Sequence, residues 1–201
     1  MLKIAITGNI GTGKSLALNF FRKRGDAIFS SDEAIAEIYA SDQRFFEKIK
    51  EFNPDFIDDD KVSKSKISLY LKDHPEFLPQ LEDILYPILK QKRADLVAIA
   101  KAEDHKFMVF EIPLLFEKHA DKEYDQIILL HADQELRWQR VKDRPNMTRQ
   151  KFEFMNRRQT NYLDVINNAN LVIDADQAPL KIENILSDYI QEITDEKGFP
   201  S

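Results

Sequence analysis

The sequence contains no cysteine among its 201 residues. This excludes disulfide bonds, thiol catalysis and cysteine-bound zinc, and it fits a reducing compartment. No apolar run approaches the roughly 18 residues of a membrane-spanning helix. The apolar stretch in the opening segment MLKIAIT is too short for a secretory signal. We therefore expect a cytoplasmic protein with no membrane partner, either a monomer or a small homo-oligomer.

A surplus of positive charge is also missing, because the net charge of the chain is −6 at pH 7. General binding to the phosphate backbone of nucleic acids needs a basic face, so we expect no nucleic-acid partner. The four histidines show no metal-ligand spacing. These absences leave a globular enzyme or a small-molecule binding protein as the main function classes.

Glycine is scarce and unevenly placed, since three of the 5 glycines fall in the segment GNIGTGKS, Gly8–Ser15. This segment fits the pattern G-x-x-x-x-G-K-[ST], preceded by an apolar run and followed by a helical pattern. Glycines let the backbone N–H groups of such a loop point at phosphate oxygens, where the start of the next helix adds partial positive charge. Lys14 would supply a cation for the phosphates and Ser15 an oxygen for Mg²⁺. The segment predicts binding of a nucleoside triphosphate by Asn9, Ile10, Gly11, Thr12, Gly13, Lys14, Ser15 and Leu16.

Five short apolar runs are typical of strands buried on both faces of a parallel sheet. They are Leu2–Thr7, Ala27–Ser30, Phe107–Ile112, Gln126–His131 and Asn170–Ala175. Helical patterns alternate with them, and the patterns after the fourth run are DQELRWQRVKDR, TRQKFEFMNRRQTNYLDVINN and APLKIENILSDYIQEI. We therefore predict an α/β fold with a doubly wound five-stranded parallel sheet and helices on both faces. The gap of some 75 residues between the second and third strands predicts a helical insertion.

Two carboxylates follow predicted strands at the edge where open α/β sheets bind ligands. Asp32 comes after the second strand. It is either an acid in the first turn of a helix or the group that orients an acceptor hydroxyl and takes its proton. Glu111 ends the third strand, and it would either hold Mg²⁺ or its water, or bond Ser15 or the backbone.

Positive charge is concentrated between Arg137 and Arg158, a segment with a charge of +6 in a chain whose remainder carries −12. Arg137, Arg140 and Arg144 have the spacing of one helical face. A solvated basic face is the usual explanation of such a run. Next to a phosphate loop, we favour a short lid whose arginines neutralise charge on the transferring phosphoryl group.

The order and spacing of several segments resemble the dephospho-coenzyme A kinase family over about residues 2–174. These segments are GNIGTGKS, SSDEAIAEIY, LEDILYPILK, FEIPLLFE, DQELRWQRVKDR, RRQ and NANLVID. The resemblance implies transfer of the ATP γ-phosphoryl group to the ribose 3′-hydroxyl of dephospho-coenzyme A. It also implies Mg²⁺ as a cofactor and dephospho-coenzyme A as the small-molecule substrate.

Carried over by position, the resemblance implies catalytic roles for Asp32, Lys14 and Arg140, with Arg137 and Arg144 as further nucleotide-binding arginines. Ser15 and Glu111 would be the metal ligands. One P-loop kinase domain would then span residues 1–201. Its predicted parts are a core at about 1–31, 104–134 and 169–195, a helical acceptor-binding insertion at about 32–103, and an arginine-rich lid at about 135–168.

Three positions depart from the family pattern. Tyr86 stands where the family often has histidine, Glu111 where it often has aspartate, and Lys64 near the place of an arginine. Lysine at position 64 cannot form the bidentate fork of arginine. The three departures lie mainly on the acceptor side, so they bear on binding of the acceptor.

Two other functions are also compatible with the phosphate loop. A nucleoside monophosphate kinase would have the same core and a different acceptor. A regulatory P-loop NTPase is less favoured, because no Asn-Lys-x-Asp motif exists and the only Asp-x-x-Gly is Asp195 to Gly198.

Overall fold

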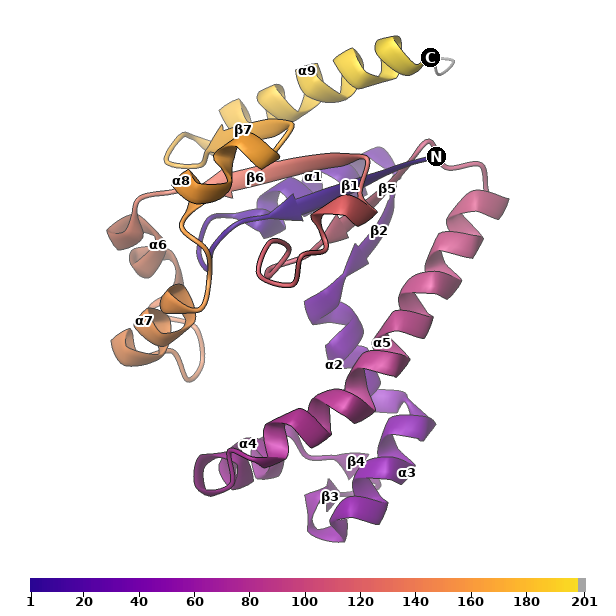
Figure 1. Ribbon diagram of the computed structural model, residues 1–201, viewed down its shortest axis with the longest axis vertical. Coiled ribbons are helices and arrows are strands. Elements are labelled where there is room, and N and C mark those ends of the chain that lie inside the picture. Colours follow the sequence, from indigo (N-terminus) through magenta and orange to yellow (C-terminus); the bar gives the residue numbers. More distant parts are fainter. Residues whose placement is uncertain (199–201) are drawn as a thin grey trace. The chain divides into compact units, whose positions relative to one another are not determined.

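Figure 1 shows a computed structural model of the chain, which describes residues 1–198. A five-stranded sheet has the order β2-β5-β1-β6-β7. Strand β1 runs parallel to β5 and β6, and β6 runs parallel to β7. The bounds are Leu2–Thr7 for β1, Ala27–Ser30 for β2, Phe107–Glu111 for β5, Gln126–His131 for β6 and Leu171–Asp174 for β7. The predicted α/β sheet is confirmed, although the third and fifth predicted strands were too long at their ends.

The chain divides into two compact units. One contains residues 1–28 together with the chain from Glu103 onward, and the other contains Phe29–Ala102. The bounds of the second unit lie close to those predicted for the acceptor-binding insertion, whose role stays a prediction. The predicted domain that ends at 201 includes three residues outside the described part of the chain.

The first unit holds the central part of the sheet and packs its main apolar cluster against one face. Its helices are α1 Lys14–Arg24, α6 Gln134–Val141, α7 Arg149–Arg157, α8 Tyr162–Val165 and α9 Pro179–Lys197, with 3₁₀ turns at Asp121–Glu123 and Ile166–Asn168. Helices α1 and α9 contribute Phe21 and Leu186, which contact β-strand residues such as Ile128. A smaller cluster around Ala5, Leu115 and Ile127 lies apart from the main one. The buried strands fix the position of the loop that follows β1.

The second unit has its own apolar core. Its elements are α2 Ser31–Ser41, α3 Gln43–Phe52, a 3₁₀ turn Pro54–Phe56, β3 Ile57–Asp58, β4 Lys61–Val62, α4 Lys64–Asp73 and α5 Phe77–Ala102. The side chain of Ser30 accepts the N–H of Glu33 at 3.4 Å, so the predicted cap at the start of α2 is confirmed. The antiparallel pair of β3 and β4 was missed, because its turn is Asp59–Asp60 rather than a glycine-containing pair.

Two helical predictions after β6 were wrong in detail. The three arginines do not share a helix, since α6 ends at Val141 and Arg144 lies beyond it. The helical pattern over residues 148–168 is interrupted, since α7 ends at Arg157 and α8 begins at Tyr162. In the intervening segment, Gln159 and Thr160 form hydrogen bonds with other parts of the chain.

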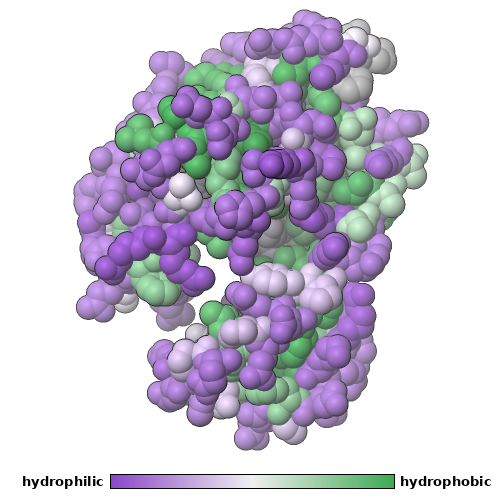
Figure 2. Space-filling view, viewed as in Figure 1, coloured by the Kyte–Doolittle hydropathy of each residue, from purple (hydrophilic) through white to green (hydrophobic). Residues whose placement is uncertain are grey.

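Hydrophilic residues cover most of the face of the molecule seen in Figure 2. Within residues 1–198, no helix is both long and apolar enough to cross a membrane.

The buried aromatic side chains of α3 provide a test of the second core. Phe45 is 0% exposed, whereas Phe52 on the same helix is 40% exposed. We expect Phe45→Ala to lower the free energy of unfolding by about 3–5 kcal/mol, because the change removes apolar contacts and leaves a cavity. Urea unfolding measures the loss, with Phe52→Ala as the matched control. Equal losses for the two variants would contradict this assignment of the core.

Candidate phosphate-binding site

The loop Gly8–Gly13 connects β1 to the first turn of α1. A Cβ added at Gly13 would meet no atom within 4 Å. The backbone N–H groups of Gly11 and Gly13 make no hydrogen bond to any other residue among 1–198. Together with the start of α1, these groups are unbonded donors of the kind that bind anions at helix starts, so the predicted phosphate site stays a prediction.

The loop carries its own cation and its own internal bonds. The Nζ of Lys14 donates to the carbonyls of Gly8 at 2.8 Å and Asn9 at 3.2 Å. The hydroxyl of Thr12 donates to the Asn9 carbonyl at 2.8 Å, and Thr12 is buried. The ammonium group is therefore held at the loop by carbonyls that the oxygens of a bound phosphate could replace.

The residues predicted to hold Mg²⁺ lie in the same unit as the loop. Ser15 is exposed, and its hydroxyl bonds to no residue in the described part of the chain. Glu111 is buried at the end of β5, in register with Ile6 of β1. Within residues 1–198 no group of three or more acidic or histidine side chains could hold a metal by itself. This donor set fits Mg²⁺, which takes most of its ligands from nucleotide phosphates and water.

Ile10 joins the loop to the lid segment at three points. Its side chain is buried with Val141 of α6 and Phe152 of α7. Its N–H donates to the side-chain oxygen of Gln159 at 2.7 Å, and its carbonyl accepts from Arg137 at 3.4 Å. The polar groups of Ile10 therefore face the lid segment, and its predicted nucleotide contact stays a prediction.

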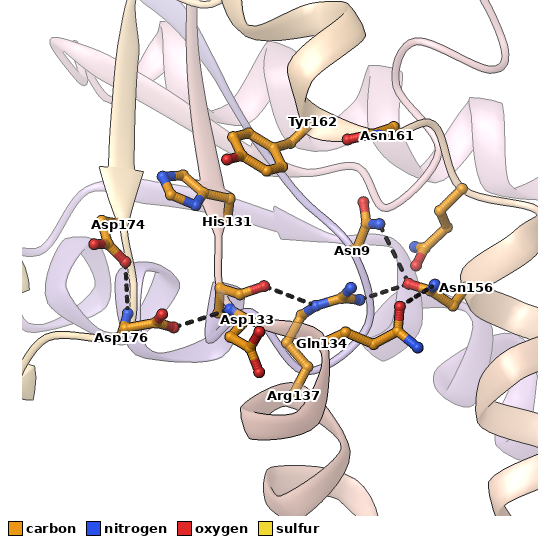
Figure 3. Close-up of a pocket in the computed structure, with 12 residues that line it drawn as sticks. Asn9, His131, Asp133, Gln134, Arg137, Asn156, Asn161, Tyr162, Asp174 and Asp176 are labelled. Carbon is orange, nitrogen blue, oxygen red and sulfur yellow. Dashed lines mark hydrogen bonds between the residues drawn. The ribbon is translucent and has the colours of Figure 1, made fainter.

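Arg137 is a buried arginine, only 7% exposed. Its Nε donates to the Ala132 carbonyl at 3.0 Å, and its terminal nitrogen donates to Asn156 at 2.7 Å (Figure 3). Burial lowers the pKa of the Arg137 guanidinium. These bonds connect the end of β6, the loop and α7, and a role of Arg137 in nucleotide binding stays a prediction.

The other two predicted lid arginines are exposed. Arg140 donates to the carbonyls of Ala175 at 2.6 Å and Gly11 at 3.4 Å, so its guanidinium lies beside the loop. Arg144 follows the end of α6, and its side chain has no hydrogen bond to residues 1–198. These two arginines are accessible cations of the lid segment, which has further exposed basic residues at Lys142, Lys151, Arg157 and Arg158.

A polar cavity of about 520 Å³ lies beside the loop, at the ends of β6 and β7 (Figure 3). Its acidic side chains serve the local backbone. Asp133 accepts the N–H groups of Glu135 and Leu136 at the start of α6, and Asp176 accepts the N–H of Asp133. Asn9 and Asn156 form part of its lining. Of these lining residues, Asn156 and Gln159 were missed as site residues, although the RRQ segment that contains Gln159 was a recognisable motif.

The predicted acceptor-side residues lie in the second unit. Asp32 is the second residue of α2, is exposed, and has no ion pair or hydrogen bond within the described residues. The Nζ of Lys64 lies 5.7 Å from the ring centroid of Tyr39. Tyr86 on α5 is 42% exposed.

Comparison with known proteins identifies relatives. The sequence pattern of the family described as "Dephospho-CoA kinase" matches residues 2–181. A dephospho-CoA kinase from Bartonella quintana is 35% identical over 156 residues, which cover 78% of this chain and 80% of the relative. Among solved structures, TT1252 from Thermus thermophilus has a TM-score of 0.78 at 24% identity and covers 97% of both chains. A dephospho-CoA kinase from Campylobacter jejuni has a TM-score of 0.72 at 22% identity and covers 97% of this chain and 98% of its own. These two structures show the same fold.

The close approach of Gly11 to α6 gives a test of the loop. A Cβ at Gly11 would lie 2.6 Å from the Arg137 carbonyl oxygen, and a shift of the backbone would be needed. We expect Gly11→Ala to weaken binding of a nucleoside triphosphate at least about tenfold, a loss of about 1.4 kcal/mol. Isothermal titration calorimetry measures the affinity.

Gly25→Ala is the matched control for Gly11→Ala. Gly25 also has positive φ, +81°, but nothing lies within 4 Å of an added Cβ. Its replacement should cost about 1–2 kcal/mol of stability from backbone strain and leave the affinity unchanged. Unaltered affinity in Gly11→Ala would show that the loop is not the phosphate site.

Proposed function

The chain belongs to the dephospho-CoA kinase family, and from this premise we propose how its own residues carry out the reaction. Members of this ATP-dependent family catalyse the final step of CoA biosynthesis, and this is the activity of the chain. The finer proposal is transfer of the ATP γ-phosphoryl group to the ribose 3′-hydroxyl of dephospho-CoA in the cytoplasm.

The geometry of the loop before α1 carries the proposal. The unbonded N–H groups of Gly11 and Gly13 and the ammonium of Lys14 lie at one helix start. Such an arrangement suits a chain of phosphates rather than a single carboxylate, because it offers several donors and a full positive charge. We assign Lys14 to the β- and γ-phosphates, where its charge offsets the negative charge of the transferring group.

The accessible arginines supply the remaining positive charge. Arg140 donates to the Gly11 carbonyl, so its guanidinium lies beside the loop to which we assign the phosphates. We propose that Arg140 stabilises charge in the transition state and that Arg144 contacts the nucleotide. Positive charge that is oriented in advance lowers the barrier of phosphoryl transfer, because the transition state spreads negative charge over the phosphoryl oxygens.

Ser15 and Glu111 would hold Mg²⁺ from the side of the protein. When bound, this ion would neutralise part of the negative charge of the phosphates. The exposed hydroxyl of Ser15 can reach a ligand in front of α1. Glu111, at the end of the strand beside β1, would bind the ion or one of its waters.

Asp32 is proposed as the group that aims the acceptor. A new bond forms between the ribose 3′-oxygen and the γ-phosphorus, while the bond from the γ-phosphorus to the β,γ-bridging oxygen breaks and ADP leaves. The proton of the hydroxyl goes to the Asp32 carboxylate. Asp32 suits this role because it follows β2 directly and has no protein partner within residues 1–198 that would compete for its oxygens.

The choice of acceptor separates this function from the nucleoside monophosphate kinase alternative. We expect phosphorylation of dephospho-CoA with a kcat/KM at least about 100-fold above that for AMP, UMP or adenosine, because a larger acceptor offers more binding energy to the transition state. A coupled assay of ADP release with each acceptor measures the ratios. Preference for AMP or UMP would favour the alternative.

Replacement of the proposed base tests the mechanism. We expect Asp32→Asn to lower kcat by about 10²–10⁴-fold, since asparagine keeps the size of the side chain but cannot take the proton. Direct measurement of ATP binding should give the wild-type affinity, because the phosphate loop is unchanged. Glu37→Gln, an exposed change on the same helix, is the control and should keep full activity. A wild-type kcat in Asp32→Asn would show that Asp32 only stabilises the start of the helix and takes no part in the reaction.

A further inference from the structure

Gln159 lies between two loops and bonds both of them through one side chain. Its Oε1 accepts the N–H of Ile10 in the phosphate loop at 2.7 Å. Its Nε2 donates to the carbonyl of Pro113, in the segment that follows β5, at 3.4 Å. We propose that Gln159 is a positioning residue that fixes the phosphate loop in its nucleotide-binding form.

The chemistry of the two contacts selects an amide. Ile10 offers a donor and Pro113 offers an acceptor, so the bridging side chain needs one acceptor and one donor at the same end. Glutamine has both, and its orientation follows from its two partners. A carboxylate could accept from Ile10 but could not donate to Pro113, and a hydrocarbon could do neither.

The position of Gln159 in the chain is itself fixed. The N–H of Thr160 donates to the carboxylate of Glu117, beyond Pro113 in the same segment. These bonds explain why the helix pattern stops after Arg157, because the chain here bonds the segment after β5 instead of continuing α7. Motifs far apart in the sequence, PLLFE and RRQ, therefore meet at the phosphate loop.

The bridge acts on the peptide groups next to Gly11. With the Ile10 N–H held by Gln159 and the Ile10 carbonyl near Arg137, this residue cannot turn without breaking bonds to the lid segment. The N–H groups of Gly11 and Gly13 then stay unbonded and available. Without the bridge, binding ATP would have to order the loop first, and the affinity would fall. This step rests on the proposed role of the loop in phosphate binding.

Two variants test the bridge in the full chain. We expect Gln159→Leu to raise the KM for ATP about 10–100-fold, as follows from losing both hydrogen bonds, with a smaller effect on kcat and on the KM for the acceptor. Gln159→Glu should show a similar defect at about pH 8, where the carboxylate lacks a donor. The defect should diminish as the pH falls towards about 4.3, the ordinary pKa of a glutamate carboxyl, because the protonated acid regains both bonds. The KM for ATP of the variant is divided by that of the wild type at each pH. This ratio removes the pH dependence that the two proteins share.

A second readout needs no nucleotide. Amide hydrogen exchange at Ile10, followed by NMR, should be faster in Gln159→Leu than in wild type, because its acceptor is gone. Gln150→Leu and Gln150→Glu are the matched controls, since Gln150 is an exposed glutamine on α7 without a hydrogen bond within residues 1–198. They should leave both the exchange and the pH profile unchanged.

The outcomes separate the bridge from the phosphate site. Unchanged Ile10 exchange in Gln159→Leu, or a Gln159→Glu profile parallel to that of wild type, would overturn the proposal. If Gln159→Leu does not fold, the Gln159→Glu profile decides. Faster Ile10 exchange without any change in ATP binding would also overturn the positioning role of Gln159. If Gly11→Ala likewise left ATP binding unchanged, the loop would not be the phosphate site, which would count against the proposed function instead.

Discussion

The site depends on the contact between the phosphate loop and the start of α6. Gly11 lies so close to Arg137 that a Cβ would be 3.0 Å or less from its backbone atoms. Next to it, Ile10 is buried against α6 and α7 and bonded to Gln159 and Arg137. A loop that must offer its N–H groups to a ligand cannot bond them internally, so its shape has to be held from outside. The lid segment provides that support.

The arginines of the lid segment have different environments because of this contact. Arg137 is buried, and the loss of its hydration costs free energy. Its hydrogen bonds to carbonyls and to Asn156 offset this cost. Arg140 and Arg144 keep their charge at the surface, where it is available to a nucleotide. The three arginines predicted to act together thus differ, since Arg137 is buried and Arg140 and Arg144 are accessible.

The polar cavity beside the loop shows a similar division. Its carboxylates would suggest a cation site from composition, yet Asp133 and Asp176 are used to accept backbone N–H groups around the start of α6. These hydrogen bonds hold the turn between β6 and α6. Two of the three asparagines of its lining, Asn9 and Asn156, connect it to the phosphate loop.

Local chemistry made much of the fold predictable. The strands near the loop were found almost to the residue, because runs such as Ile4–Ile6 are buried on both faces and carry no polar interruption. The cap at Ser30 was also predictable, since an N-cap bonds within three residues. The hairpin at Asp59–Asp60 was not, because its turn residues give only a weak signal. The end of α7 was not predictable either, since helical periodicity continues past it and only a distant segment stops it.

By itself, the sequence determined the phosphate loop, the parallel sheet and the family, because these depend on residue types at short spacings. The tertiary structure alone decided which arginine of the lid is buried and which residues hold Ile10. Those choices follow from contacts between residues more than a hundred positions apart, such as Ile10 with Gln159. No periodicity or local spacing encodes such a pair, because the geometry that joins them exists only once the sheet is assembled.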